Sequence, residues 1–480
     1  MPGQRRFLFL SLFLTLCSML TFTSAGTAFA TTNSTASVRS CVTPGATNTL
    51  SPVIGGANNL IQVPANWNGT LLLYSHGYVF VGQPLTASDA SDPLTAAALL
   101  QQGYALAGSS YSQNGWALQQ AFHDQIALLN FFDATCGQPA RTIPWGDSLG
   151  GIITAGLVQL FPQRFAGAVP LCGVVSGGVG TWNEALDATF AFNTLLAGGA
   201  LPVVHIQNPS GEFNQAEQIL ASAQNTVQGR ARIALISALD DLPGWFNEAS
   251  PQPASNDFTT QEQNQFLWNS QIDFPFAFLA RAELESRAGG NPSWNVGVNY
   301  DLQLAQSADF KEVVALYKQA GLNLNQDLHA LNTAPRINAD PQAVKYLSQF
   351  ITFDGDLDIP VLTMHTAGDG LVVNENEQSY AAVAREAGDA NQLRQVFVNR
   401  AGHCSFTPAE NLVALHTLIN RLNTGRWGNS TNPTLMNQEA AAFGPGLNVL
   451  LTQALPAQAS AFIPFTPGPF LRPFAFPQRF

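Results

Sequence analysis

Residues 141–151 read RTIPWGDSLGG, and this segment gives the strongest indication of the fold. The apolar run from Arg141 to Trp145 is typical of a short buried strand, and the apolar residues up to Leu160 predict a helix directly after the glycines. Between them, Gly146-Asp147-Ser148-Leu149-Gly150 fits the pattern Gly-x-Ser-x-Gly. A sharp turn from strand to helix strains such a serine and exposes its hydroxyl, while the glycines let neighbouring elements approach. Ser148 is therefore the candidate nucleophile.

Two later loops offer the partners that a nucleophilic serine needs. A base must take the serine's proton, and an acid must orient that base. Asp369 follows an expected strand over residues 359–365, and His403 follows another over residues 393–398. The chain order Ser148, Asp369, His403, with the acid and the base each after a late strand, is that of α/β-hydrolases. Asp369 is therefore the candidate acid and His403 the candidate base.

Strand and helix patterns alternate along two parts of the chain, on either side of a long middle segment. Expected strands cover residues 59–63, 70–75, 104–109, 141–145, 166–171, 359–365 and 393–398. Helical patterns lie between or after them, at residues 92–100, 117–132, 152–160, 375–387 and 408–422. The alternation predicts an α/β protein with a mostly parallel central sheet that helices cover on both faces. Because residues 66–69 contain an Asn-Gly turn, we expect the first two strands to pair with each other.

The middle segment, residues 174–350, is rich in Gln, Asn, Ala and Phe and has mainly helical patterns, with a break or kink expected at Pro275. A structureless loop of this length is improbable, so we expect a large helical cap domain inserted before the last two strands. The expected division is a signal peptide at 1–30, a hydrolase core at 31–173 and 351–425, the cap at 174–350 and a C-terminal extension at 426–480. The extension is rich in Pro and Phe, has no helical pattern, and is expected to pack along the body.

Charge and the N-terminal residues narrow the function classes. The chain has 20 Lys and Arg against 32 Asp and Glu, a net charge of −12, and no basic run. A protein that binds nucleic acid or an anionic membrane needs a basic patch, so neither partner is expected. Arg5 and Arg6, an apolar run and Ala28-Phe29-Ala30 are typical of a signal peptide that is cleaved near Ala30. Since that run is too short to cross a bilayer, we expect a secreted, extracellular protein without a stable membrane anchor.

The cysteines have a different meaning in an extracellular protein than in a cytosolic one, because an oxidising compartment favours disulfides. Four cysteines follow Ala30, namely Cys41, Cys136, Cys172 and Cys404. An even number in an oxidising compartment predicts two disulfides, for which the sequence allows three pairings, and free buried thiols are the alternative. No Cys-x-x-Cys spacing indicates zinc, so neither a metal nor a cofactor is expected.

The motifs together resemble those of the α/β-hydrolase superfamily over about residues 60–173 and 351–423. Tyr74-Ser75-His76-Gly77-Tyr78, at the end of an expected strand, is similar to the superfamily's His-Gly oxyanion loop. The resemblance implies that the backbone N–H groups of Tyr78 and Leu149 hold the oxyanion of the reaction.

The residue after the histidine resembles a narrower group. Cys404 directly follows His403, as in the feruloyl esterase and tannase family, where a disulfide joins this cysteine to one directly before the serine. Asp147 occupies that second position here. The resemblance implies that Cys172, after the next expected strand, joins Cys404 instead, which leaves Cys41 with Cys136.

These features predict a secreted serine hydrolase that cleaves carboxylic esters through an acyl-enzyme intermediate. Ser148 attacks the acyl carbon, His403 moves the proton, and Asp369 orients the histidine. The low charge and the cap favour a small-molecule or polymeric substrate with an apolar or aromatic acyl group. Trp116 and Trp182 are candidates to line its cleft, with core packing as the alternative.

The alternative function is that of a secreted exopeptidase or amidase with the same fold. An acidic cluster in the cap that binds a substrate's free amine would favour it, and the candidates are Asp240, Asp241, Glu283 and Glu285. A binding protein that kept the fold without catalysis is not favoured, because the triad and the oxyanion loop are intact. Nothing in the sequence sets the oligomeric state.

Overall fold

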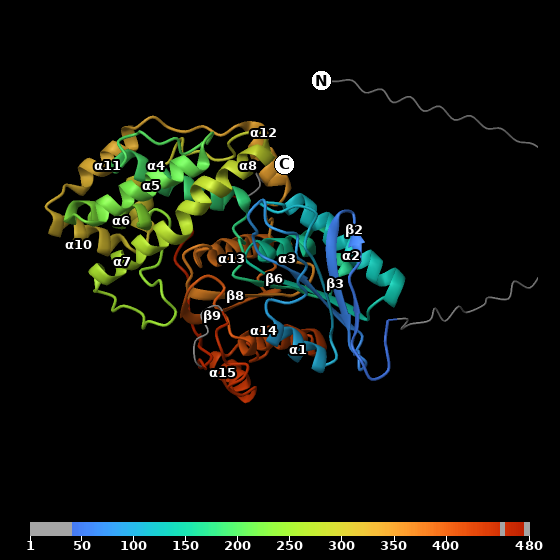
Figure 1. The fold of residues 1–480 in the computed structure, drawn as a ribbon. Helices are drawn as coiled ribbons and strands as arrows, with labels where there is room; N and C mark the ends of the chain where they lie inside the picture. The colour runs from blue at the N-terminus through green and yellow to red at the C-terminus, as the bar shows by residue number, and fades with distance from the viewer. Residues whose placement is uncertain (1–40, 452–456, 475–480) are drawn as a thin grey trace, which may run out of the picture.

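The computed structural model describes residues 41–451 and 457–474, which form a core built on a sheet beside a lobe of helices (Figure 1). The signal peptide predicted for residues 1–30 lies outside the described residues. Within the described ranges, no helix is both long and apolar enough to cross a membrane.

One mixed sheet runs through the core in the order β1-β3-β5-β4-β6-β7-β8-β9-β10. The strands are β1 (Asn48–Leu50), β3 (Ala57–Val63), β4 (Thr70–Ser75), β5 (Ala105–Ser109), β6 (Arg141–Asp147), β7 (Val169–Leu171), β8 (Val361–Gly368), β9 (Leu393–Ala401) and β10 (Phe462–Ile463), with β2 (Val53–Ile54) paired to β3. The six strands from β5 to β9 pair in parallel, whereas β1, β3 and β10 are antiparallel to their neighbours. A mostly parallel sheet with this strand order and a serine turn directly after a central strand is the α/β-hydrolase fold, so the predicted fold class is confirmed.

The hairpin predicted around residues 66–69 is wrong, because β5 lies between β3 and β4. Leu60 of β3 is opposite Gly108 of β5, and Leu72 of β4 is opposite Leu106 on the other edge of the same strand. All six residues of β4 are buried, as expected for a strand inside a parallel sheet, whereas a hairpin with one solvated face has alternating burial. The Asn-Gly turn is part of a longer connection that carries the chain past the position of β5.

Helices cover both faces of the sheet, as predicted. They are α1 (Pro93–Gln101), α14 (Pro408–Thr424) and α15 (Pro433–Ala442) on one face, and α2 (Leu118–Cys136), α3 (Leu149–Leu160) and α13 (Glu375–Ala387) on the other (Figure 1). Side chains of β4 alternate between the two layers, because successive strand residues point to opposite faces. Leu71 and Leu73 pack with α2 and α3, whereas Leu72 and Tyr74 pack with α1 and α14.

The segment between β7 and β8 forms the helical lobe. After the short 3₁₀ turn η1 (Pro162–Arg164) and β7, its elements are α4 (Gly178–Leu195), α5 (Pro209–Gln224), α6 (Val227–Ala238), α7 (Phe258–Trp268), the π-helical turns η2 (Asn269–Asp273) and η3 (Pro275–Ala280), α8 (Arg281–Ala288), α9 (Tyr300–Gln306), α10 (Phe310–Ala320), α11 (Leu324–Thr333) and α12 (Pro341–Gln349). The lobe has its own apolar core, which includes Phe192, Ile233 and Phe278. The lobe corresponds in position to the segment for which a helical cap was expected.

The C-terminal extension packs along the body, but it is not devoid of helix. Helix α15 begins after Asn432, whose side chain accepts hydrogen bonds from the first turn, and this helix is absent from the sequence-based expectation. Farther on, β10 adds a strand to the sheet beyond β9. Arg472 then reaches the helical lobe, where its guanidinium pairs with Asp187 of α4. The extension therefore links the far edge of the sheet to the lobe.

Candidate active site

Ser148 stands on the turn between β6 and α3, at the carboxyl end of a parallel strand. Its φ of 59° is positive, a conformation that a residue with a side chain adopts only under strain. The flanking glycines are required sterically, because a Cβ on Gly146 would lie 2.2 Å, and one on Gly150 1.9 Å, from the carbonyl oxygen of Ser75. The Ser148 N–H donates to the carbonyl of Leu171 at 3.0 Å. The turn therefore has the strained geometry that the motif predicts.

Asp369 and His403 follow β8 and β9, and the structure brings them together. The His403 Nδ1 atom lies 2.8 Å and 3.0 Å from the two Asp369 carboxylate oxygens. Asp369 is fully buried, and it also accepts the N–H groups of Leu371 and Val372 at 3.1 Å. Burial alone would raise the pKa of Asp369, but the charge of His403 and the hydrogen bond from His365 lower it to about 2. The acid is therefore ionised and points at the ring nitrogen that a triad acid must bind.

Two disulfides are present, and one of them ties the serine side of the site to the histidine loop. Cys172 follows Leu171, the residue that holds the Ser148 N–H, and it is bonded to Cys404, next to His403. The other disulfide joins Cys41 to Cys136. Asp147, which stands where the feruloyl esterase and tannase family has a cysteine, accepts a hydrogen bond from the Tyr74 hydroxyl at 2.8 Å instead. The pairing is the one that the resemblance implied.

His403 turns its second nitrogen toward the disulfide in this state. Its Nε2 atom lies 3.3 Å from the Cys404 sulfur, and these two described side chains, Ser148 and His403, form no hydrogen bond with each other. Catalytic hydrogen bonds are often loose in an enzyme without substrate. For catalysis, Nε2 would have to face the serine hydroxyl instead.

The loop after β4 lies directly against the serine. A Cβ on Gly77 would lie 3.3 Å from the Ser148 Cβ, so the glycine permits this close approach. The loop is held by His76, whose ring stacks on Tyr111 with centroids 4.1 Å apart and whose carbonyl accepts the Tyr111 hydroxyl. Leu149 is the first residue of α3, so its N–H has no partner within the helix. Tyr78 directly follows Gly77 and Leu149 directly follows Ser148, so both predicted oxyanion residues belong to segments that meet at the serine.

A second histidine, His365, lies behind Asp369, and the sequence pattern does not single it out. Its Nε2 atom is 2.7 Å from the Val372 carbonyl and 3.5 Å from Asp369, and its Nδ1 atom is 3.1 Å from Glu377. Burial alone would lower the pKa of His365, but the two carboxylates raise it to about 10. The ring is therefore a buried cation between two acids. In the sequence, the one indication of this role is that His365 precedes Asp369 by four residues, and that indication is weak.

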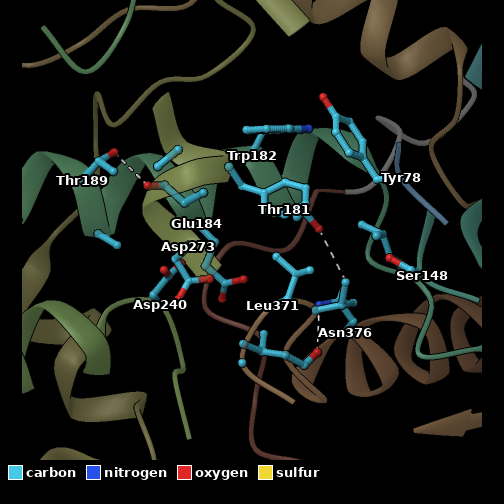
Figure 2. A pocket seen from close by; sticks show the side chains of 18 of the residues that line it. Tyr78, Ser148, Thr181, Trp182, Glu184, Thr189, Asp240, Asp273, Leu371 and Asn376 are labelled. Carbon is cyan, nitrogen blue, oxygen red and sulfur yellow. Dashed lines mark hydrogen bonds between the residues drawn. The ribbon is translucent and has the colours of Figure 1, made fainter. Parts of the chain in front are cut away.

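A cavity opens beside Ser148 and extends between the core and the helical lobe (Figure 2). Apolar side chains form most of its wall, including Trp116, Trp182 and Leu371. The two indole rings meet edge to face with centroids 5.5 Å apart, so both predicted cleft residues line the cavity. Their Nε1 atoms, and the hydroxyl of Tyr78, are buried without a hydrogen-bond partner in the described part of the chain. No group of the described chain therefore uses these three cavity donors.

The predicted break at Pro275 shapes one wall of this cavity. Proline has no N–H for the helical ladder, and the chain widens into the π-helical turns η2 and η3 on both sides of it. These turns direct Asn269, Asp273 and Phe276 to the cavity. Phe276 packs against the Tyr78 ring with centroids 5.2 Å apart, so the lobe contacts the oxyanion loop.

Carboxyl groups line the side of the cavity away from Ser148. Figure 2 shows Glu184, Asp240 and Asp273 grouped there, and all three line the cavity. Burial raises the pKa of Asp240 to about 7, and burial together with neighbouring acids raises the pKa values of Glu184 and Asp273 well above their usual range. Asp240 was a predicted candidate, whereas the sequence pattern does not single out Glu184 or Asp273.

The other predicted acids have different positions. Asp241 lies behind the cavity wall in contact with Glu184. The Glu283 carboxylate pairs with Arg287 at 2.6 Å and accepts a hydrogen bond from the backbone N–H of Trp116 at 2.9 Å. Glu285 accepts the Ile206 N–H at 3.2 Å. Glu283 and Glu285 therefore have structural partners and do not line the cavity.

One group of described side chains brings its donor atoms close enough together for a metal ion, namely Cys172, His403 and Cys404. Two of these residues are joined in a disulfide, which removes the thiolates that a metal would need. This group therefore does not fit a metal ion.

The chain is similar to hydrolases of known name. It is 28% identical over 419 residues to the o-phthalyl amidase of Xanthobacter agilis, with 82% of this chain and 90% of that protein covered. Among solved structures, feruloyl esterase B from Aspergillus oryzae matches at 14% identity and a TM-score of 0.39, with 79% of this chain and 81% of that chain covered. Proline iminopeptidase from Mycobacterium smegmatis matches at 15% identity and a TM-score of 0.32, with 83% of this chain and all of that chain covered.

A family model also matches the chain, over residues 51–415. The model describes a tannase-like family of unknown function, and the match spans the strands from β2 to β9, the helical lobe and the three expected triad residues. The chain therefore belongs to the tannase-like family DUF6351.

Proposed function

We propose that the protein is a serine hydrolase that cleaves a carboxylic ester or amide through an acyl-enzyme intermediate. The observation that carries the proposal is the strained Ser148 at the mouth of an apolar cavity, with the bonded pair of Asp369 and His403 on the neighbouring loops. Membership of the tannase-like family and the similarity to a protein named as an amidase support a hydrolase.

The geometry suggests the role of each group. With Nε2 facing the serine, His403 takes the Ser148 proton as the hydroxyl attacks the acyl carbon, and Asp369 stabilises the resulting imidazolium. The N–H groups of Tyr78 and Leu149 bind the negative charge on the carbonyl oxygen. His403 then gives the proton to the leaving alcohol or amine, and a water molecule releases the acid by the same steps in reverse.

The helical lobe is proposed to act as a cap that selects a compact substrate. The centre of a water molecule can move through about 80 Å³ of the cavity. One bound water needs roughly 15 Å³ on the same measure, so the cavity holds a group several times larger. Because the lobe contacts the oxyanion loop through Phe276 and Tyr78, a small molecule fits better than an extended polymer. Its wall favours an apolar or aromatic acyl group.

Esters are the first substrates to test, and amides are the second candidate. The proposal predicts that a fluorophosphonate probe labels Ser148 and that p-nitrophenyl esters of graded acyl length release nitrophenol. Both signals should vanish in Ser148→Ala. The matching p-nitroanilides measure amide cleavage, which the name of the amidase relative favours. If wild-type protein neither reacts with the probe nor cleaves either series, the proposed function is wrong.

We also propose that the protein is exported and loses residues 1–30. The two disulfides support an oxidising compartment, since thiols stay reduced in most cytosols. N-terminal sequencing of protein recovered from the culture medium should begin at Thr31. A full-length chain retained inside the cell would contradict this.

A further inference from the structure

We propose that the acidic side of the cavity, formed by Glu184, Asp240 and Asp273 with Asp241 behind them, binds an ammonium group of the substrate. The inference rests on the proposed function, because it assigns a substrate class to the same cavity. The natural substrate would then carry an organic amine, separated by an apolar segment from the carbonyl that Ser148 attacks.

The first argument is that these carboxyl groups, apart from the hydrogen bond between Glu184 and Asp241, leave buried oxygen atoms without a partner. Glu184 is 3% exposed, and its Oε1 atom has no hydrogen-bond partner in the described ranges. One carboxylate oxygen each of Asp241 and Asp273 is buried in the same condition. A buried carboxylate without a donor or a cation is strongly unfavourable, so a protein rarely keeps one without a use. Glu184 lines the cavity, so a ligand can reach it.

The second argument is that no described Lys or Arg pairs with any of these four acids. The nearby guanidiniums are engaged elsewhere. Arg472 pairs with Asp187, and the buried Arg281 donates to the Trp182 carbonyl at 2.9 Å and to the Ser293 hydroxyl at 3.2 Å. No described cation of the chain therefore pairs with these acids, so a cationic ligand can take that place.

The third argument concerns the kind of cation. The donor atoms of these acids do not converge closely enough to form a metal site among the described residues. They come from three separate segments, α4, the end of α6 and the turn η2, and stand around one side of the cavity (Figure 2). An ammonium group has several N–H donors that point in different directions, so spaced acceptors suit it. The Trp182 and Leu371 side chains between the acids and Ser148 suit a hydrocarbon link.

The acids around this side of the cavity lead to a further expectation, namely that binding of a cation changes their protonation. Besides burial, Glu375 and Asp309 raise the pKa of Asp241, Asp241 and Asp240 raise that of Glu184, and Asp240 and Asp369 raise that of Asp273. These like charges and burial keep the proton on part of the cluster, and a bound ammonium reverses that preference. Binding of the cation should therefore release protons from the protein.

The test uses three small aromatic probes of similar shape and different charge: benzylammonium, benzyl alcohol and benzoate. Each is titrated by calorimetry at pH 7 into full-length Ser148→Ala, which cannot turn over, and each is tested as an inhibitor of ester hydrolysis by wild-type protein. Benzylammonium is expected to bind at least about tenfold more tightly than the other two, a difference of about 1.4 kcal/mol. Calorimetry in two buffers with different ionisation enthalpies should reveal the released protons.

Variants locate the effect. Glu184→Gln and Asp273→Asn, each combined with Ser148→Ala, should lose most of the preference for benzylammonium, whereas Glu386→Gln, an exposed carboxyl on α13, should keep it. Circular dichroism and thermal melting check that each variant is folded. Equal affinity for benzyl alcohol and benzylammonium would overturn the proposal. Tighter binding of benzoate would also overturn it, because the cavity donors would then serve an anion.

The two proposals fail in different ways. If the fluorophosphonate probe does not label Ser148 and neither substrate series is cleaved, but benzylammonium binds, the ammonium site stands and the hydrolase proposal falls. If Ser148 is labelled and the three probes bind alike, the hydrolase proposal stands and the ammonium site falls.

Discussion

Two sets of carboxyl groups, one bound to His403 and one on the acidic side of the cavity, behave in opposite ways. Asp369 has two histidines and two backbone N–H groups around it, and its pKa is lowered to about 2. The buried Glu184 and the half-buried Asp273 lie beside other acids, without a cation, and their pKa values are raised well above the usual range. Burial is common to both sets, so the partners decide the role. One set holds a fixed charge, and the other can gain charge when a cation arrives.

The largest difference is expected when an aspartate is replaced by asparagine, once beside His403 and once on the acidic side of the cavity. Asp369→Asn should lower kcat for a p-nitrophenyl ester by about 10,000-fold, because an amide neither fixes the histidine tautomer nor stabilises the imidazolium. Asp273→Asn should cost at least about 100 times less, because that group is not bound to His403. Steady-state kinetics measure both variants. Losses of similar size would remove the distinction.

A substitution of His365 tests whether catalysis depends on a second positive charge beside Asp369, in addition to that of His403. His365→Gln should lower kcat/KM by about tenfold, or 1.4 kcal/mol, because Asp369 loses a positive neighbour. The acid limb of the pH profile of kcat/KM should move to higher pH, since removal of a positive charge favours protonation nearby. His416→Gln is a matched control, because His416 lies on α14 and contacts Glu439 and Gln102 instead. A loss of activity without a shift of the profile would indicate only a structural role.

The acids that have no cation as a partner predict how the free energy of unfolding depends on pH. Burial raises the pKa values of Asp240, Asp309 and Glu375 to about 7, whereas unfolded Asp and Glu titrate near 4. Between about pH 4 and pH 7 the folded protein therefore binds more protons than the unfolded chain, so the free energy of unfolding falls as pH rises. Asp369 has the opposite shift, but its contribution is complete above about pH 5. Calorimetric melting should give a Tm at pH 5 that exceeds the value at pH 8 by about 3 °C or more. An equal or higher Tm at pH 8 would show that these acids have partners.

The smallest effect is expected from neutralising one uncompensated acid. Glu184→Gln should raise the Tm at pH 8 by about 1–3 °C, because the amide avoids the cost of a buried charge. Glu386→Gln, at an exposed site of α13, should leave the Tm unchanged. Differential scanning calorimetry resolves such a shift. A lower Tm in Glu184→Gln would mean that the carboxylate stabilises the free protein.

Much of the core could be predicted because its causes are local. The alternation of Leu71 to Tyr74 between two helix layers, and the glycines around Ser148, follow from strand geometry and steric contact. The partner of β3 could not be predicted, because an Asn-Gly turn does not tell which strand will lie beside it. Helix α15 has a visible Asn-Pro start at residues 432–433, but its short apolar pattern is weak.

The acidic side of the cavity was harder to predict than the triad. Asp369 and His403 are marked by the strands that they follow, and parallel strands end at one edge of a sheet. Glu184 lies within a helix, and Asp273 reaches the cavity only because Pro275 widens the helix into π-helical turns. Which way such residues point depends on packing between the lobe and the core, and no local pattern records that packing.

The C-terminal extension carries an evolutionary consequence. Arg472, 48 residues beyond the end of α14, neutralises the buried Asp187 on α4, the helix that also carries Trp182 and Glu184. A homologue whose chain stops before this arginine would keep an acid in its lobe without a counter-charge. We therefore expect the length of the tail and the charge at position 187 to be inherited together, as a co-varying pair across the family.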